Sequence, residues 1–245
     1  MRTGLGEGAP PCGPQATARL RLTKTGPCRF MSHLDFMRAV ERAARRADIP
    51  VALTRGFHPH PRMSFGPAVP VGVESECELV DVDLRESLGA AEITRRLVRV
   101  LPSGIQLVRC RVLPPGGPSL SSMITAASYQ VDFDRDDIAG GPGVLDSAIG
   151  GILHADAIPF SRTTPKGTRE FDLRPLIYDL RLLSGDGPRL RVQMMLATGS
   201  RGHARPDDVA RAIAEWAGLA PEVRPSRIAR KELYVAWDGG LRPLA

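Results

Sequence analysis

The sequence is poor in lysine and in aromatic residues. Only Lys24, Lys166 and Lys231 are lysines among its 33 basic residues, so arginine carries almost all of the positive charge. Aromatic residues make up 5% of the chain. The 33 basic residues exceed the 27 acidic ones and give a net charge of +6, which is compatible with a polyanionic partner without requiring one.

Long apolar runs are also missing. No run approaches the roughly 18 residues that a membrane-spanning helix needs. The first two residues lead into a stretch of Gly and Pro rather than the apolar core of a signal peptide. We therefore expect a cytoplasmic protein with no membrane partner. With 42% hydrophobic and 24% charged residues, the composition is that of a packed globular protein and excludes wholesale disorder.

Motifs that hold cofactors are absent. The four cysteines, Cys12, Cys28, Cys77 and Cys110, form neither a C-x-x-C pair nor the C-x-x-x-C-x-x-C triplet of an iron–sulfur site, so we expect reduced thiols. No nucleotide-binding loop, H-E-x-x-H or nucleophile elbow occurs. The sequence thus predicts no cofactor.

The first half alternates strands and helices. A capping box at Ser32 and Asp35 predicts a helix that begins at His33. Hydrophobic periodicity predicts helices over residues 33–47 and 89–100 and strands over residues 18–23, 50–53, 79–84 and 105–112. This order is that of the ferredoxin-like split βαβ fold.

The second half has a weaker pattern of the same kind. Strands are predicted over residues 128–133, 157–163, 178–183, 190–197 and 227–235, and helices over residues 144–153 and from Pro206. A second split βαβ unit with an inserted hairpin fits this order.

We therefore predict an α+β protein of five parts. These are a disordered tail (residues 1–15), a ferredoxin-like domain (16–113), a linker (114–127), a second related α+β domain (128–237) and a tail (238–245).

Apolar residues at helical spacing predict which helix faces enter the core. In the first helix the stripe is Leu34, Met37, Val40 and Ala44. In the helix from Pro206 it is Val209, Ile213 and Trp216. We expect Trp216 and Trp237 to pack in the core or at its edge rather than to bind a ligand.

Several blocks of the first half resemble a known family. RFMSHLD (residues 29–35), the helix that follows it, GFHPHPRMSF (56–65) and VGVES (71–75) resemble the bacterial radical-SAM-linked, or radical-SAM-associated, protein family. The resemblance covers residues 18–113, and KGTREFDLRP (166–175) is similar to a second family block.

The resemblance implies a domain of uncharacterised function. It is found alone, often encoded beside ribonuclease E/G genes, or at the C-terminal end of chains that carry cobalamin-binding and radical-SAM modules. Because this chain lacks those modules and the cluster cysteines, the resemblance implies a partner of a radical-SAM enzyme or of the ribonuclease E/G pathway, not the radical enzyme itself.

The first candidate site is basic. Arg38, Arg42 and Arg45 are spaced by four and three residues and share one helix face, with Arg46 adjacent. Such a row could contact phosphates, while Phe57 and Phe65 stack on exposed bases as in single-stranded RNA binders. The alternative is a solvated face on which Asp35 and Glu41 pair with some of the arginines.

The second candidate is a histidine cluster in the proline-rich loop of residues 54–67. His58 and His60 alternate with prolines, and His33 and Asp35 could face the same loop. These groups could bind a transition metal or move protons, but His-Pro-His lacks a helical ligand pair. A second alternative is that the imidazoles hydrogen-bond to backbone carbonyls and fix the loop. We favour a third, in which the loop contacts a ligand and needs no metal.

The third candidate is the basic turn that contains Lys166, Arg169 and Arg174 around Gly167, which could bind a phosphate or be plain solvated surface. Residues predicted to contact nucleic acid are Arg38, Arg42, Arg45, Arg46, Phe57, His58, His60, Arg62, Phe65, Lys166, Arg169 and Arg174.

Three functions follow from these candidates. The leading hypothesis is a non-catalytic accessory module that binds RNA and works with a separate radical-SAM or RNA-processing enzyme. The second is a protein adaptor that docks a radical-SAM enzyme. The third is a small metal or acid–base enzyme centred on His33, Asp35, His58 and His60.

Overall fold

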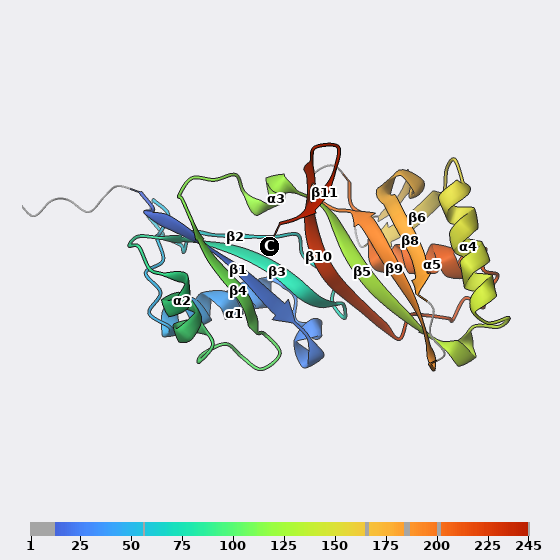
Figure 1. Ribbon diagram of the computed structural model, residues 1–245, viewed down its shortest axis with the longest axis horizontal. Helices are drawn as coiled ribbons and strands as arrows, with labels where there is room; N and C mark the ends of the chain where they lie inside the picture. The colour runs from blue at the N-terminus through green and yellow to red at the C-terminus, as the bar shows by residue number, and fades with distance from the viewer. Residues whose placement is uncertain (1–12, 56, 165–166, 184–186, 200–201, 245) are drawn as a thin grey trace, which may run out of the picture.

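The computed structural model of the chain describes residues 13–55, 57–164, 167–183, 187–199 and 202–244. A long, mainly antiparallel sheet runs through both halves, with helices packed against it (Figure 1). The predicted α+β class is therefore confirmed. Within the described residues, no helix has the length and apolar character needed to cross a membrane.

The first half packs two helices on its strands. Its elements are β1 (Ala16–Lys24), η1 (Gly26–Phe30), α1 (His33–Arg46), β2 (Met63–Phe65), β3 (Glu74–Leu84), α2 (Ala90–Leu97) and β4 (Leu107–Leu113). Strand β1 pairs antiparallel with β3 and β4, and β2 pairs with the C-terminal part of β3. The strand predicted over residues 50–53 is reduced to isolated bridges at Val51 and Leu53, because Pro50 and Pro61, which lies opposite Leu53, have no N–H to donate to a ladder.

The start of α1 matches the sequence prediction. Helix α1 begins at His33, and the N–H of Asp35 donates to Ser32 Oγ at 3.2 Å. The Ser32 hydroxyl also donates to the Asp35 carboxylate at 2.7 Å. The first of these bonds satisfies an N–H donor that the first helical turn would otherwise leave without a partner, and the second holds the two side chains together.

In the described residues of the second half, six strands and two helices are longer than five residues. Its elements are α3 (Leu120–Met123), β5 (Ile124–Asp134), η2 (Arg135–Asp137), α4 (Pro142–His154), β6 (Pro159–Thr164), β7 (Gly167–Asp172), η3 (Arg174–Leu176), β8 (Ile177–Leu183), β9 (Arg189–Ala197), α5 (Pro206–Trp216), β10 (Arg227–Trp237) and β11 (Gly240–Pro243). Residues 114–127, the expected linker, thus contain α3 and the start of β5, and residues 238–245, the expected tail, contain β11.

The two halves repeat one strand order. The first half has β4-β1-β3-β2 and the second has β10-β5-β9-β8, so each fourth strand lies beside the first and each third strand beside the second. The hairpin β6–β7 is inserted between α4 and β8. The halves join where β10 pairs in parallel with β3, at Ala229 with Glu74 and Arg230 with Ser75. Since one sheet joins them, independent ferredoxin-like domains over residues 16–113 and 128–237 stay a prediction.

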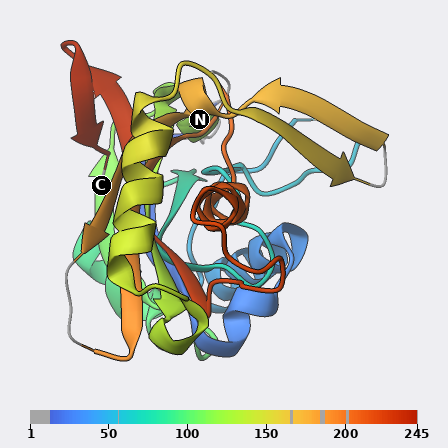
Figure 2. The same cartoon turned by 90° about the vertical axis from the view of Figure 1, so that its right-hand side faces the viewer.

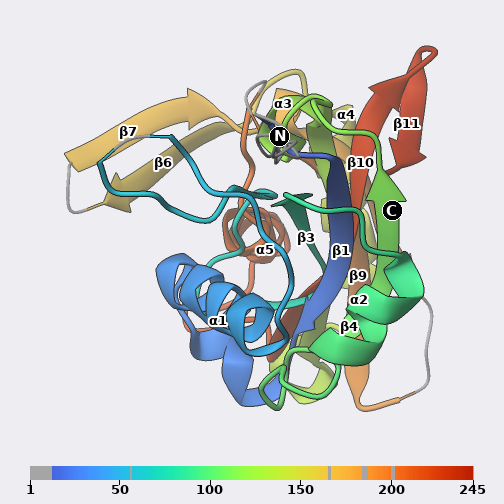
Figure 3. The same cartoon turned by 90° about the vertical axis from the view of Figure 1, so that its left-hand side faces the viewer.

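Helices α1 and α5 lie on the same side of the sheet (Figures 2 and 3). The hairpin β6–β7 projects away from the body of the molecule on that side. One core cluster lies under α1 and α2, and a second lies under α4 and α5. Val73, Cys77 and Leu79 of the first half belong to the second cluster.

The predicted core stripes are partly wrong. Helix α1 buries Phe36, Val40 and Ala43, which share a face at spacings of four and three, whereas Leu34 is 61% exposed because it lies on the opposite side of the helix. Trp216, 47% exposed, lies over Gly151 of α4, where a Cβ would come within 2.9 Å of its ring.

Trp237 is also exposed, and it belongs to the hairpin β10–β11. The guanidinium carbon of Arg242 lies 4.1 Å from the centre of its ring. Trp237 is therefore a surface residue rather than a core one. Among the cysteines, Cys28, Cys77 and Cys110 are free thiols, and Cys12 lies outside the described residues.

Candidate nucleic-acid interface

The outer face of α1 presents four exposed arginines. Arg38, Arg42, Arg45 and Arg46 are all exposed, opposite the face that packs on the sheet. Arg38 lies 3.7 Å from the carboxylate of Asp35. Within the part of the chain that the structure describes, the other three have no acidic group within ion-pair distance. At 1.5 Å per residue the row extends about 12 Å along the helix, enough to contact more than one phosphate.

The loop that follows α1 also presents side chains to solvent. Phe57 is 103% exposed, and His58 and His60 are exposed as well. The backbone closes this loop: the N–H of Thr54 donates to the His60 carbonyl at 2.8 Å, and the N–H of His60 donates to Thr54 Oγ1 at 2.9 Å. A closed, proline-rich loop can therefore hold Phe57 at its tip.

Arg62 and Phe65 anchor this loop to the fold. Arg62 Nε donates to Asp83 at 3.0 Å. The Phe65 ring meets the rings of His33 and Phe36 edge-on, at 6.0 Å and 6.4 Å between centroids. Phe65 is only partly exposed, because its ring packs against the start of α1, and little of it is open to a base.

The histidines do not gather with Asp35. Among the described residues, no group of three His, Cys, Asp or Glu side chains is close enough to hold a metal ion. His33 contacts Phe65, whereas His58 and His60 lie in the exposed part of the loop. The cluster that the enzyme hypothesis places at His33, Asp35, His58 and His60 is therefore not assembled.

The described arginines of the third candidate lie in different places, one on the surface and one inside the fold. Lys166 lies outside the described residues, and Arg169 is exposed on β7, so residues 167–169 are strand rather than the turn predicted from Gly167. Arg174 donates to the carbonyls of Ile177 and Leu153 at 2.9 Å and 2.8 Å. Because Leu153 belongs to the last turn of α4, this guanidinium satisfies a helix end inside the fold.

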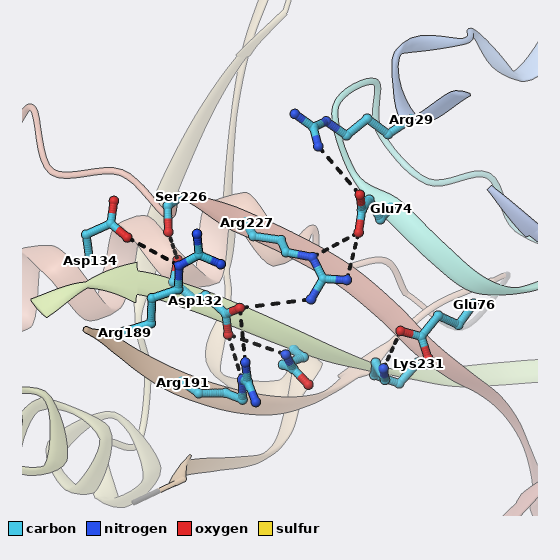
Figure 4. Close-up of polar contacts among 11 residues, drawn as sticks. Arg29, Glu74, Glu76, Asp132, Asp134, Arg189, Arg191, Ser226, Arg227 and Lys231 are labelled. Atoms are coloured by element: carbon cyan, nitrogen blue, oxygen red, sulfur yellow. Dashed lines mark hydrogen bonds and ion pairs between the residues drawn. The ribbon is translucent and has the colours of Figure 1, made fainter. Parts of the chain in front are cut away.

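Sequence reasoning missed a chain of alternating charges across the junction of the halves (Figure 4). Glu74 of β3 lies 3.5 Å from Arg29 and accepts from Arg227 of β10 at 2.9 Å. Arg227 lies 3.9 Å from Asp132 of β5, which accepts from Arg191 of β9 at 2.8 Å. Burial would raise the pKa of Glu74, but the hydrogen bonds from Arg227, Gly26 and Arg29 outweigh it and lower that pKa.

A second ion pair lies wholly inside the junction. Arg230 is 0% exposed and donates to Glu78 at 2.7 Å, to Ser75 Oγ at 3.2 Å and to the Pro67 carbonyl at 2.5 Å. Burial would lower the pKa of Arg230, but the charge of Glu78 keeps it above its ordinary value. Lys24, also buried, donates to the Met31 carbonyl at 3.4 Å.

A pocket of about 260 Å³ opens beside these ion pairs. Its lining comes from η1, the start of α5 and two segments that flank the β3–β10 junction: Arg29, Phe30, Pro70, Val71, Gly72, Val73, Glu74, Asp207, Pro225, Ser226, Arg227 and Ile228. The surrounding protein limits the solvation of the Asp207 carboxylate, and together with the charge of Asp208 this raises the pKa of Asp207.

A larger hollow, of about 830 Å³, lies between strands β1–β3 and residues 113–119. Its charged groups are paired, with Arg19 on Asp81 at 2.8 Å and Arg62 on Asp83 at 3.0 Å. Each arginine of the hollow therefore already has a carboxylate partner.

Chains in three solved structures match this chain. A chain in the crystal structure of a Cbf5-Nop10-Gar1 complex matches at TM-score 0.51 and 10% identity, over 88% of this chain and 48% of that chain. A chain in the archaeal box H/ACA sRNP Nop10-Cbf5 complex matches at TM-score 0.45 and 10% identity, over 87% and 46%. A chain in the structure of H/ACA RNP bound to a substrate RNA containing 2'-deoxyuridine matches at TM-score 0.43 and 10% identity, over 87% and 46%.

This chain therefore spans about half the length of the chains that it matches. At 10% identity the likeness to the Cbf5-Nop10-Gar1 structure is one of fold. Among curated proteins, no sequence matches this chain.

A family of sequences does match. The family described as "Uncharacterized protein conserved in bacteria (DUF2344)" matches residues 18–206, which include most of β1, the rest of the first half with the arginine row of α1, and the second half from α3 to β9. Because the match covers most of the chain, the protein belongs to this conserved bacterial family.

Proposed function

We propose that the protein binds single-stranded RNA along α1 and the loop that follows it. The observation that carries this proposal is the row of exposed arginines, Arg38, Arg42, Arg45 and Arg46, together with the fully exposed ring of Phe57 in the loop after α1. Guanidinium groups bind phosphates through paired N–H donors, and an exposed aromatic ring stacks on an unpaired base. Both groups are on one continuous segment, from α1 to residue 57.

The stiffness of the loop also supports an RNA ligand. Pro59 and Pro61 restrict the backbone around His58 and His60, and the Thr54–His60 bonds close the loop. A loop ordered before binding loses less conformational entropy when its ring stacks on a base. The matching chain of the Cbf5-Nop10-Gar1 structure is similar in fold alone, so the support for RNA binding comes from the arginine row.

We propose in addition that this binding is accessory and non-catalytic. In this view the protein presents RNA to a separate radical-SAM enzyme or works in the ribonuclease E/G pathway. The resemblance of residues 29–75 and 166–175 to the radical-SAM-linked family supports such a partner.

Replacing Arg38, Arg42 and Arg45 together with Gln tests the RNA-binding surface. The three side chains are exposed, so the variant should fold normally, while its affinity for a fluorescein-labelled uridine 20-mer falls at least tenfold. Each lost phosphate contact lowers the slope of log K against log salt by about 0.7, so the slope should fall by about 2 in all. Fluorescence anisotropy from 50 to 300 mM salt gives both quantities.

A matched control removes the same charge elsewhere. The triple variant R99Q/R109Q/R111Q changes exposed arginines next to α2 and on β4, and it should retain nearly full affinity and slope. Equal losses in the two triple variants would mean that net charge alone attracts RNA. A wild-type protein that binds no RNA but captures a radical-SAM enzyme would favour the adaptor hypothesis instead.

A further inference from the structure

The pocket of about 260 Å³ beside the β3–β10 junction, called here the junction pocket, lies close in the sequence to the proposed RNA surface. Phe30 and Arg29 belong to η1, which ends three residues before the first residue of α1. Asp207 enters the same pocket from the first turn of α5, and Arg227 enters from the start of β10. The pocket therefore lies beside the segment that leads into the N-terminal end of α1.

One wall of the pocket has an open aromatic surface. Phe30 is 60% exposed, and the guanidinium carbon of Arg29 lies 4.7 Å from the centre of its ring. Val71 on the neighbouring segment is exposed as well. The Phe30 ring is flat and can stack on a planar ligand, while Val71 adds apolar surface beside it.

The charges of the pocket are balanced. Arg29 and Arg227 both face Glu74, at 3.5 Å and 2.7 Å. Asp207 keeps an exposed surface, and among the described residues it has no ion-pair partner. A pocket with two arginines and two carboxylates has no net attraction for a phosphate, whereas the Asp207 carboxylate can accept from a neutral N–H group.

We propose that this pocket binds a single nucleobase turned out of the RNA held along α1. Phe30 stacks on the base, and Asp207 accepts a hydrogen bond from a base N–H. The volume of about 260 Å³ lies just below the roughly 300–1,000 Å³ of pockets for drug-sized ligands, which suits a base rather than a whole nucleotide. The inference rests on the proposed RNA binding and adds the group that is recognised.

Photo-crosslinking tests the location. A 12-mer of uridine with 4-thiouridine substitutions is irradiated with the full chain, and the crosslinked peptides are identified by mass spectrometry. We expect crosslinks at Phe30 and in residues 70–73 in addition to crosslinks in α1 and the loop of residues 54–62. Crosslinks confined to α1 and the loop would overturn the pocket and leave the proposed function intact, whereas no RNA binding by the wild type would overturn the proposed function itself.

Two variants and one control test the chemistry. F30A should weaken binding of the uridine 12-mer roughly 5- to 150-fold, the range for losing one base–aromatic stack, with an unchanged salt slope because no phosphate contact is lost. D207N should change the relative affinities for uridine, cytidine and adenosine 12-mers at least threefold. W237A removes another exposed ring that lies under an arginine and should change neither quantity.

A loss of affinity in F30A can be assigned to binding rather than to unfolding, because Phe30 is exposed and its replacement leaves the core intact. An F30A variant with wild-type affinity and a D207N variant with an unchanged base preference would overturn the inference. Equal effects of F30A and W237A would show that exposed aromatics bind RNA without a specific pocket.

Discussion

Arginine serves opposite purposes at two places in this molecule. Arg230 is buried in the sheet, and its donors bind Glu78, Ser75 and the Pro67 carbonyl. Arg42 and Arg45 on α1 are exposed, and in the described chain they lack an acidic partner. The same side chain is therefore a structural tie in one region and an open donor in the other.

This contrast shows why a count of basic residues is a poor guide to ligand binding. A buried arginine without its partner would leave an unpaired charge away from water, so its contacts belong to the fold. An exposed arginine contributes little to stability and can exchange water for a phosphate. Burial and partner, rather than residue type, separate the two roles.

The most damaging change should be Arg230→Ala. It leaves Glu78 buried without its ion-pair partner, which costs about 3–5 kcal/mol of unfolding free energy. Urea denaturation measures this loss. The double variant R230M/E78L removes both charges and should recover much of it, and a loss below about 1 kcal/mol in R230A would place Arg230 with the surface arginines.

The ion pairs of Glu74 should make the unfolding free energy depend on pH. The pKa of Glu74 is lowered in the folded protein, so its contribution is present above the unfolded pKa and is lost as the pH falls through the folded pKa. We expect E74Q to cost about 1–3 kcal/mol at pH 7 and to lose less stability than the wild type on acidification. Denaturation from pH 7 to pH 3 tests this, with exposed Glu222→Gln as control. Parallel pH curves for E74Q and the wild type would contradict it.

The cap of α1 should have a smaller effect. Ser32→Ala removes the oxygen that accepts from the Asp35 N–H and should cost about 1 kcal/mol, whereas Ser32→Gly should cost only a few tenths. Thermal unfolding followed by circular dichroism compares the two. Equal losses would mean that the hydroxyl does not support the start of the arginine helix.

The loop histidines should matter less still for stability. His58 and His60 are exposed, so H58N/H60N should change the unfolding free energy by less than about 0.5 kcal/mol. A loss of about 1–3 kcal/mol in chemical denaturation would instead show that the imidazoles anchor the loop through hydrogen bonds.

The smallest effect on stability should come from R42Q/R45Q/R46Q. These side chains lie in solvent, and we expect a change within about 0.5 kcal/mol. Denaturation and RNA anisotropy on the same sample sharpen the contrast with Arg230: stability should stay and affinity should fall. A large stability loss would mean that this row has structural partners.

Local patterns in the sequence predicted the elements well. The Ser32–Asp35 box gave the first residue of α1, and the proline at the start of α5 marked that helix. Side-chain burial was harder to predict, since Leu34 and Trp216 fit a helical stripe but are exposed. Periodicity suggests a face, and only tertiary packing decides which residues of the helix are buried.

The junction could not be predicted from local patterns. Glu78 and Arg230 are 152 residues apart, and Glu74 and Arg227 are 153 apart. Two glutamates four residues apart in an otherwise buried strand were a signal that partners must exist, but their identity depends on which strand lies beside β3. The pocket of Phe30 and Asp207 was missed for the same reason.

The spacing of the buried pair has a consequence for synthesis. At a translation rate of roughly 5–20 residues per second, Arg230 follows Glu78 by about 8 to 30 s, given the 152 residues between them. During that time the first half leaves the ribosome with Glu78 still lacking its ion-pair partner. The nascent chain must therefore keep this carboxylate hydrated or protonated, and the last long strand to be made completes the centre of the sheet.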